Sequence, residues 1–293
     1  MSSKIIDGKL IANQLISDLS IKVKSLKARY NITPHLAIVQ VGDNPSSTLY
    51  IQNKITKCKE ININYEFYHF SQDFDEKALK TAIININHDL NIHGIIVQLP
   101  LPSHIAVNNV TNLINPSKDV DGFTPTNTGL LFSNQECFIP CTPQGCLILL
   151  KTIFKDLSGK KALVIGRSNI VGKPLSYLLL KENCTVTMAH SYTKNLQSET
   201  LNTDIIIAAT GAAGLINADY IKEGTVIIDV GINMVKQGEK TIFRGDVDFT
   251  EVLPKVRAIT PVPGGVGPMT IACLLKNVML ACCKINNIDY SKL

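Results

Sequence analysis

Three residues able to contact or activate a substrate, Ser47, Tyr50 and Lys54, lie in the stretch VGDNPSSTLYIQNK. The apolar run Leu36–Val41 predicts a buried strand, Gly42–Pro45 predicts a turn, and an amphipathic helix is expected to follow. Spacings of three and four put the three side chains on one helix face, near the carboxyl end of a strand, where α/β proteins usually place ligands. A solvated lysine on a surface helix has the same local pattern, so further segments must decide between the two interpretations.

Two polar residues in other segments could complete such a site. Gln98 lies inside the apolar strand-like run Gly94–Leu99. An unpaired buried amide costs about 1–3 kcal/mol, so Gln98 must have a hydrogen-bond partner, whether structural or catalytic. Asp121 is the second of two acids in the turn-like segment Pro116–Phe123, where carboxylates are ordinarily solvated.

A phosphate-binding turn is predicted within Ala162–Pro174, which reads as a strand, a glycine turn and a helix start. Glycines let backbone N–H groups approach a pyrophosphate, and the helix N-terminus adds about half a positive charge. Only Gly166 and Gly172 are present, six residues apart, so the standard Gly-x-Gly-x-x-Gly is absent and an ordinary strand-to-helix turn would also fit.

The strand predicted at Thr185–Met188 indicates which dinucleotide would bind. NAD sites end this strand in an acid for the ribose hydroxyls. Here the following residues offer hydroxyls and a cation, Lys194, and Arg167 lies in the first turn. A 2′-phosphate is therefore accommodated better than a free ribose, which favours NADP. His190, at the end of this strand, could simply be a strand-end residue.

The segment Thr260–Thr270 (TPVPGGVGPMT) is the most distinctive in the chain. Its closely spaced glycines and prolines impose an unusual backbone path, which an ordinary interdomain loop seldom needs.

Composition limits the class of protein. The length of 293 residues predicts two domains. The formal net charge of +5 is mild, and the sequence has no dense basic block of the kind that binds nucleic acid. Polar residues in the N-terminal segment argue against a signal peptide, and the sequence has no uncharged apolar run of 18 residues, so we expect a cytoplasmic protein with no membrane partner. The eight cysteines show no metal-ligand spacing, which predicts reduced thiols, no metal and no disulfide framework.

Alternating strand and helix signals predict an α/β fold with parallel sheets. We expect the domain boundary near Pro140–Thr142, and a helix over Pro268–Cys283 that is apolar nearly all round and must be buried. Two further helices are expected over residues 75–90 and, with Ser103 as N-cap, over residues 103–114. Besides the strands already named, the second half of the chain carries strand-like runs at Lys161–Ile165, Asp204–Ala208 and Thr225–Val230.

Five segments together resemble the bifunctional methylenetetrahydrofolate dehydrogenase/methenyltetrahydrofolate cyclohydrolase family, over nearly the whole chain. They are VGDNPSSTLYIQNK, VQLPLP, the turn with Asp121, GRSNIVGKP with the later His190-Ser191, and PVPGGVGPMT. The resemblance implies a folate-binding catalytic domain over residues 1–140, a Rossmann-type NADP domain over 141–267, and a helix over 268–293 that returns to the first domain. It places the folate pocket between the domains.

The resemblance also implies the chemistry of one-carbon metabolism, which serves purine biosynthesis. NADP⁺ takes a hydride from 5,10-methylenetetrahydrofolate, and the methenyl product is hydrolysed to 10-formyltetrahydrofolate by a homodimeric enzyme. The catalytic residues it implies are Lys54, Gln98, Tyr50 and Asp121. The substrate contacts it implies are Ser47, Tyr50, Val97, Gln98, Leu99, Asp121, Pro263, Gly264 and Gly265. The cofactor contacts it implies are Gly166, Arg167, Ser168, Gly172, Ser191 and Ile232.

Two departures from the family pattern stand out. Leu130 replaces a common arginine or lysine, and Ala208–Gly214 replaces the usual Ala-Val-Gly-Lys-Pro, so the resemblance implies no particular cofactor contact within 208–214. A dehydrogenase of another small substrate would keep residues 162–191, and a non-catalytic NADP-binding regulator would need neither Lys54 nor Gln98. Lys54 could act as a base, with partial burial and the cationic methenyl-folate disfavouring its charge, or could stay charged and orient water or substrate.

Overall fold

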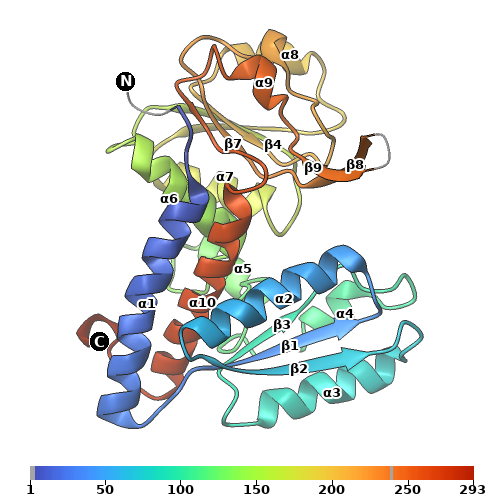
Figure 1. The fold of residues 1–293 in the computed structure, drawn as a ribbon, viewed down its shortest axis with the longest axis vertical. Coiled ribbons are helices and arrows are strands. Elements are labelled where there is room, and N and C mark those ends of the chain that lie inside the picture. The colour runs from blue at the N-terminus through green and yellow to red at the C-terminus, as the bar shows by residue number, and fades with distance from the viewer. Residues whose placement is uncertain (1–3, 238–239) are drawn as a thin grey trace. The chain divides into compact units, whose positions relative to one another are not determined.

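A computed structural model describes residues 4–237 and 240–293 (Figure 1). The chain divides into two compact units, which we name after the roles that the sequence predicts: the catalytic unit (Gln14–Cys141 with Ile271–Leu293) and the dinucleotide unit (Met1–Asn13 with Thr142–Thr270). Each unit contains a parallel sheet, as the alternation of strand and helix signals predicts. Helices α1 (Gly8–Tyr30) and α10 (Val266–Ile285) have residues in both units.

The catalytic unit is built on a three-stranded parallel sheet of order β2-β1-β3. The central strand β1 is buried at six of its seven residues, and β3 at all four, as is usual for parallel strands covered on both faces. This sheet brings the carboxyl ends of β1 and β3 side by side, since Val39 pairs with Val97. The strands are β1 (His35–Val41), β2 (Asn64–Phe70) and β3 (Gly94–Val97), and the helices between and after them are α2 (Pro45–Glu60), α3 (Glu76–His88), α4 (Val107–Thr111) and α5 (Pro125–Phe132).

Local caps fix where the first crossover helices begin. The side chain of Asn44 accepts a hydrogen bond from the Ser47 amide at 3.1 Å and starts α2. Asp75 does the same for α3, whose buried residues pack with β1 and β3 in one core cluster. The helix predicted over residues 75–90 is therefore confirmed, with its ends two residues or fewer from the prediction.

The helix predicted over residues 103–114 is shorter in the structure, where α4 covers only Val107–Thr111. Ser103 does not cap it, because a tight turn with a hydrogen bond from Ile105 N to Pro102 O precedes the helix. The carboxylate of Glu76 accepts from the Ala106 amide at 2.8 Å instead, so a residue thirty positions earlier in the chain sets this helix start.

The dinucleotide unit is built on a five-stranded parallel sheet of order β10-β7-β6-β4-β5. Since β5 lies on one side of β4 and β6 on the other, the strand order reverses between β4 and β6. The β8–β9 hairpin was not predicted from the sequence. The strands are β4 (Lys161–Ile165), β5 (Thr185–Ala189), β6 (Ile205–Ala208), β7 (Val226–Asp229), β8 (Asn233–Gln237), β9 (Lys240–Arg244) and β10 (Ala258–Ile259), and the helical segments are α6 (Cys141–Ile153), α7 (Gly172–Lys181), α8 (Leu196–Leu201), η1 (Ala218–Tyr220) and α9 (Phe249–Val252).

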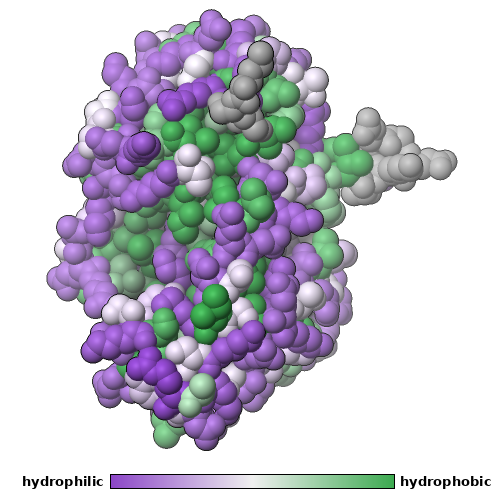
Figure 2. Space-filling model, turned by 60° about the vertical axis from the view of Figure 1, so that its left-hand side comes forward, coloured by the Kyte–Doolittle hydropathy of each residue, from purple (hydrophilic) through white to green (hydrophobic). Residues whose placement is uncertain are grey.

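The start of the chain and the last long helix complete the two units. Ile6 donates to Ile259 O at 2.8 Å, so the segment before α1 lies along β10. Helix α10 is long and apolar enough to cross a membrane by length and composition, but 72% of its most apolar window is buried. It is a core helix, which confirms the predicted burial. In Figure 2, hydrophilic residues are spread over the face shown, with groups of apolar residues between them.

Candidate active site

The central contact of the catalytic unit joins helix α2 to the end of β3. Lys54 Nζ donates to Gln98 Oε1 at 2.9 Å, and the Lys54 side chain is only 8% exposed. The amide orientation of Gln98 is fixed from its other end, because Nε2 donates to Leu99 O at 2.8 Å. The structure thus places a largely buried lysine against an oriented acceptor, at the carboxyl end of a parallel sheet.

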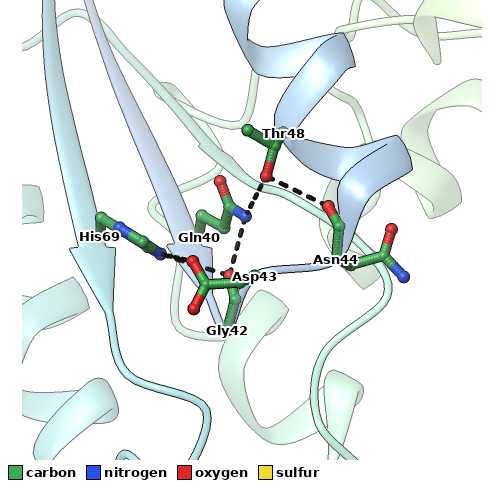
Figure 3. Close-up of polar contacts among 6 residues, drawn as sticks. All are labelled: Gln40, Gly42, Asp43, Asn44, Thr48 and His69. Carbon is green, nitrogen blue, oxygen red and sulfur yellow. Dashed lines mark hydrogen bonds and ion pairs between the residues drawn. The ribbon is translucent and has the colours of Figure 1, made fainter.

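A polar network in the turn between β1 and α2 holds the start of that helix (Figure 3). Gln40, buried inside β1, donates through Nε2 to Gly42 O at 2.8 Å and to Thr48 Oγ1 at 3.2 Å. Thr48 in turn donates to Asn44 O. His69 Nε2 lies 3.1 Å from Asp43 Oδ1 on the outer side of the turn. These bonds tie the first turn of α2 to the sheet and so orient the face that carries Tyr50 and Lys54.

The other predicted substrate residues of this unit lie around the same strand ends. Ser47 is buried and its hydroxyl lies 3.4 Å from Leu99 O. Tyr50 is half-buried one turn before Lys54, and burial raises the pKa of its phenol. Val97 is buried in the core cluster with Val39, so its side chain is occupied by packing.

The two acids of the 116–123 turn have different environments. Asp119 is buried and accepts hydrogen bonds from the amides of Phe123 and Thr124 and from Asn127 Nδ2. It therefore organises its own turn. Asp121 accepts only from the thiol of Cys141, at 3.6 Å, among the described residues.

Asp121 is electrostatically coupled to the lysine. Burial raises its pKa, while the charge of Lys54 and the hydrogen bond from Cys141 lower it and the charge of Asp119 raises it. The same burial raises the pKa of Cys58 on α2 to about 12, against the charge of Lys54. A carboxylate with spare acceptor capacity beside a cation can hold a polar ring through its N–H groups.

In the dinucleotide unit, the predicted glycine turn follows β4 at the point where the strand order reverses. Gly166 has φ +124°, and a Cβ there would collide with the carbonyl oxygen of Ala209, which follows β6. A Cβ at Gly172 would collide with the carbonyl oxygen of Gly166. Both glycines are thus required by close backbone approach, the geometry that binds a pyrophosphate at a helix N-terminus.

The residues after Gly166 have distinct surroundings. Ser168 Oγ accepts from the amides of Val171 and Gly172, the N-cap and the first residue of α7, and so holds the turn that leads into this helix. The guanidinium of Arg167 is exposed and lies 5.5 Å from the ring centre of Tyr192, which follows β5. The nearby loop places hydroxyls and a cation around the end of β5, with no acid there.

The remaining predicted cofactor and substrate residues also belong to this unit. Ser191 is exposed beside Tyr192, and Ile232 is exposed after β7. In the 260–270 loop, Pro263 is exposed and Gly265 is buried under the start of α1, because a Cβ at Gly8 would collide with the Gly265 carbonyl oxygen. Gly264 O accepts from the Lys9 amide at 2.9 Å.

Two buried carboxylates, which the sequence analysis did not select, hold the loops around the cofactor turn. Asp246 accepts from the amides of Thr210 and Gly211, so it anchors the segment that departs from the family pattern. Asp229 accepts from the Gly231 and Asp246 amides, and burial raises its pKa to about 7. The departing sequence is therefore built into a defined turn.

A parallel sheet with a glycine turn at its strand-order reversal is the architecture of a dinucleotide-binding domain. With the lysine, amide and carboxylate of the other unit, it defines a two-domain α/β enzyme of the nucleotide-dependent class.

Comparison with known proteins assigns the family. The family model described as "Tetrahydrofolate dehydrogenase/cyclohydrolase, catalytic domain" matches residues 6–121, and "Tetrahydrofolate dehydrogenase/cyclohydrolase, NAD(P)-binding domain" matches residues 140–286. The chain belongs to this family. The "Bifunctional protein FolD" of Anaplasma marginale is 50% identical over 288 residues, which cover 98% of this chain and 96% of that protein.

Solved structures agree with this assignment. The bifunctional enzyme FolD of Campylobacter jejuni is 44% identical, with a TM-score of 0.92, and the match covers 96% of this chain and 98% of that one. The Trypanosoma brucei FolD, solved with NADP cofactor and inhibitor, is 32% identical with a TM-score of 0.92, over 97% and 98% of the two chains. The fold and family expected from the sequence are confirmed.

Sequence reasoning missed several residues that hold the two candidate sites in the structure. Gln40 carries the same signal as Gln98, a polar amide inside an apolar strand, and could have been found in that way. Asn277, whose amide donates to Val120 O and Ile139 O, is visible in the sequence only as an interruption of the apolar helix α10. Cys141, Asp229 and Asp246 had no local signal, because their importance depends on residues distant in the chain.

Proposed function

We propose that this protein oxidises 5,10-methylenetetrahydrofolate with NADP⁺ and hydrolyses the resulting methenyl cation to 10-formyltetrahydrofolate. The observation that carries the proposal is the largely buried Lys54, hydrogen-bonded to Gln98 and electrostatically coupled to Asp121. Membership of the family supports both steps, since relatives named bifunctional match nearly the whole chain.

The catalytic unit supplies the groups for recognition and proton handling. Asp121 accepts hydrogen bonds from the pterin ring through the acceptor capacity that Cys141 leaves open. The half-buried Tyr50 ring lies against the folate ring system. Ser47, Leu99, Pro263, Gly264 and Gly265 are proposed as further substrate contacts, with Val97 contributing to the wall behind Gln98.

Lys54 acts in the hydrolytic step. Gln98 accepts from its amine at 2.9 Å and therefore sets the direction in which the remaining donors or lone pair point. In one form of the mechanism the neutral amine takes a proton from the attacking water. In the other the charged amine only orients the water or the substrate. Both forms require the same geometry, and both make Lys54 essential for methenyl hydrolysis.

The dinucleotide unit fits NADP. Gly166 and Gly172 have no side chain, so a pyrophosphate can approach the backbone N–H groups of this turn. Helix α7 begins at Gly172. Ser168, Ser191 and Ile232 are proposed as further contacts, and the exposed Arg167 would pair with the 2′-phosphate. When bound, NADP⁺ accepts the hydride; the chain's own residues position the folate and exclude competing reactions.

A coupled assay tests the proposal directly. The purified protein is mixed with 5,10-methylenetetrahydrofolate and NADP⁺, and the appearance of NADPH is followed together with the decay of the methenyl intermediate. Both activities are expected. A panel of other small alcohols and hydroxy acids with NADP⁺ serves as the control for a dehydrogenase of different specificity, and cofactor binding without turnover on any substrate would indicate a regulator.

Homodimer formation is part of the proposal and has a candidate surface. Strand β2 is an edge strand, and none of its seven residues is buried. Phe67 is 38% exposed and its ring stacks on His69 at 5.6 Å. An unpaired aromatic edge is typical of a strand that pairs with a partner, here a second copy of the chain.

Analytical ultracentrifugation tests this surface. The wild type should sediment as a dimer and Phe67→Asp as a monomer, while a dimeric Phe67→Asp would exclude the β2 edge. We further propose that the enzyme acts in the cytoplasm, where its folate and NADP substrates are used, and cell fractionation tests that location.

A further inference from the structure

Cys141 makes a specific contact with the proposed folate-binding acid. Its thiol is buried, lies 3.6 Å from Asp121 Oδ1 and also lies 3.4 Å from Val120 O. Among the described residues, no other side chain donates a hydrogen bond to this carboxylate. The contact engages Oδ1 of Asp121, and no residue within the described ranges donates a hydrogen bond to Oδ2.

The thiol is suited to donate a hydrogen bond and poorly suited to react. Burial, and after it the negative charge of Asp121, raise the pKa of Cys141 well above its usual value. The sulfur therefore keeps its proton near neutral pH, so it is neither a nucleophile nor a metal ligand there. Its single proton is shared between Val120 O at 3.4 Å and Asp121 Oδ1 at 3.6 Å.

Asn277 connects the two segments that carry the acid and the thiol. It is 1% exposed, in the apolar helix α10. Its Nδ2 donates to Val120 O at 2.8 Å and to Ile139 O at 3.0 Å, and lies 3.7 Å from the Cys141 sulfur. One buried amide thus fixes the backbone directly before Asp121 and two residues before Cys141.

Backbone packing brings the same segments together. Gly122, directly after Asp121, has φ +68°, and a Cβ there would collide with the carbonyl oxygen of Phe138. The segments 120–122 and 138–141 are therefore held together by the Asn277 amide and by the close approach of Gly122 to Phe138, which place the thiol beside the carboxylate.

We propose that Cys141 and Asn277 are positioning residues for Asp121, with the thiol holding Oδ1 so that Oδ2 faces the pterin N–H groups. This inference rests on the proposed function, because Asp121 contacts folate only there. Three charged or titratable groups face the carboxylate: Lys54 from α2, Asp119 from the same turn, and Cys141 from α6. Of these, Cys141 alone supplies a hydrogen bond to it within the described part of the chain.

The test uses Cys141→Val, which removes the donor at similar volume, and Cys141→Ser, which keeps one. Cys141→Val should raise KM for 5,10-methylenetetrahydrofolate about tenfold and leave KM for NADP⁺ unchanged, whereas Cys141→Ser should stay within about threefold of the wild type. The acid limb of the pH profile of kcat/KM should move to higher pH in Cys141→Val only, because the ionised carboxylate has lost its donor.

Three comparisons separate positioning from a structural effect. Cys282→Ala opens a cavity elsewhere in α10 and should leave both KM values and the pH profile unchanged. In an Asp121→Asn background, Cys141→Val should add little further loss, since the thiol acts through the carboxylate. Asn277→Leu should raise KM for 5,10-methylenetetrahydrofolate as well. The double variant with Cys141→Val should raise this KM by less than the product of the two single increases.

The outcomes are decisive in both directions. A wild-type folate KM and pH profile in Cys141→Val, or equal changes in Cys282→Ala, would overturn the inference. If Cys141→Val does not fold, Cys141→Ala carries the same comparison without added bulk. If the wild-type protein has neither the dehydrogenase nor the cyclohydrolase activity, the proposed function is refuted instead. The two failures are therefore distinguishable.

Discussion

Lys54 and Gln98, 44 residues apart in the chain, meet at 2.9 Å because α2 starts at the end of β1 and Gln98 follows β3, the neighbouring strand. Gln98 accepts through Oε1 while its Nε2 is held by Leu99 O. The amide therefore cannot turn its donor toward the lysine without losing a hydrogen bond. This fixed direction is not expected of a solvated lysine on a surface helix, and it supports the catalytic role proposed for Lys54.

Arg167→Ala should weaken the binding of NADP⁺ much more than the binding of NAD⁺. The exposed guanidinium, close to Tyr192, has no acid competing for it at the end of β5, so its expected partner is the 2′-phosphate. Loss of a charge-assisted contact should raise KM for NADP⁺ by about 10- to 100-fold. Steady-state kinetics with both cofactors measure this. The control is Arg257→Ala, because the guanidinium of Arg257 donates to Ile153 O. Equal effects of Arg167→Ala on both cofactors would show that Arg167 does not contact the 2′-phosphate.

Asp121→Asn should lower folate affinity while keeping the fold. The substitution turns one of two acceptors into a donor and so mismatches the N–H groups of the ring. Asp119→Asn is the contrasting variant, since Asp119 accepts from the Phe123 and Thr124 amides and from Asn127 Nδ2 of α5, and its loss should mainly lower the melting temperature. Titration of a folate analogue and thermal unfolding distinguish them. Unchanged folate affinity in Asp121→Asn would exclude this role.

His93 should make the protein less stable in acid. It is 6% exposed, and burial, followed by the charges of His35 and Lys118, lowers its pKa to about 4. The unfolded value is about 6.5, so the stability due to the neutral ring is fully present above that pH. It is lost as the pH falls from about 6.5 to about 4, because the unfolded state then binds the proton more tightly.

Urea unfolding measures this effect. Between pH 7 and about pH 4.5, wild-type stability should fall by about 2–3 kcal/mol more than that of His93→Gln. His88→Gln, at an exposed position on α3, should show the wild-type pH dependence. If His93→Gln and the wild type lose stability in parallel, another group is responsible for acid sensitivity.

The sequence predicted best the features that are local. Strand β4 has the bounds expected from the apolar run Lys161–Ile165, since a charged residue and a glycine end that run. Helix α4 was predicted too long, because its start depends on Glu76 from α3. The β8–β9 hairpin was missed because its alternation of apolar and polar residues is short and lies in a polar segment.

The residues of the candidate site were likewise predictable only as far as local signals reach. Gln98 stood out as a polar residue in an apolar run, whereas Lys54 and Asp121 had ordinary local patterns and were selected through the resemblance to the family motifs. The structure brings the three into one electrostatic group. Cys141 reads as a small apolar residue at a helix start, and nothing in its neighbourhood reveals the carboxylate twenty residues away. Residues that position others through tertiary contacts are invisible until the fold is known.

The most direct test of the account is methenyltetrahydrofolate hydrolysis by Lys54→Met. Methionine keeps the length of the side chain and can neither carry a proton nor donate to Gln98. Lys57→Met, on the same helix but paired with Glu60, is the matched control. Lys54→Met should lose cyclohydrolase activity to the uncatalysed rate and bind NADP⁺ as the wild type does, while Lys57→Met should remain active. Hydrolysis by Lys54→Met clearly above the uncatalysed rate would contradict the central claim that the chemistry depends on Lys54.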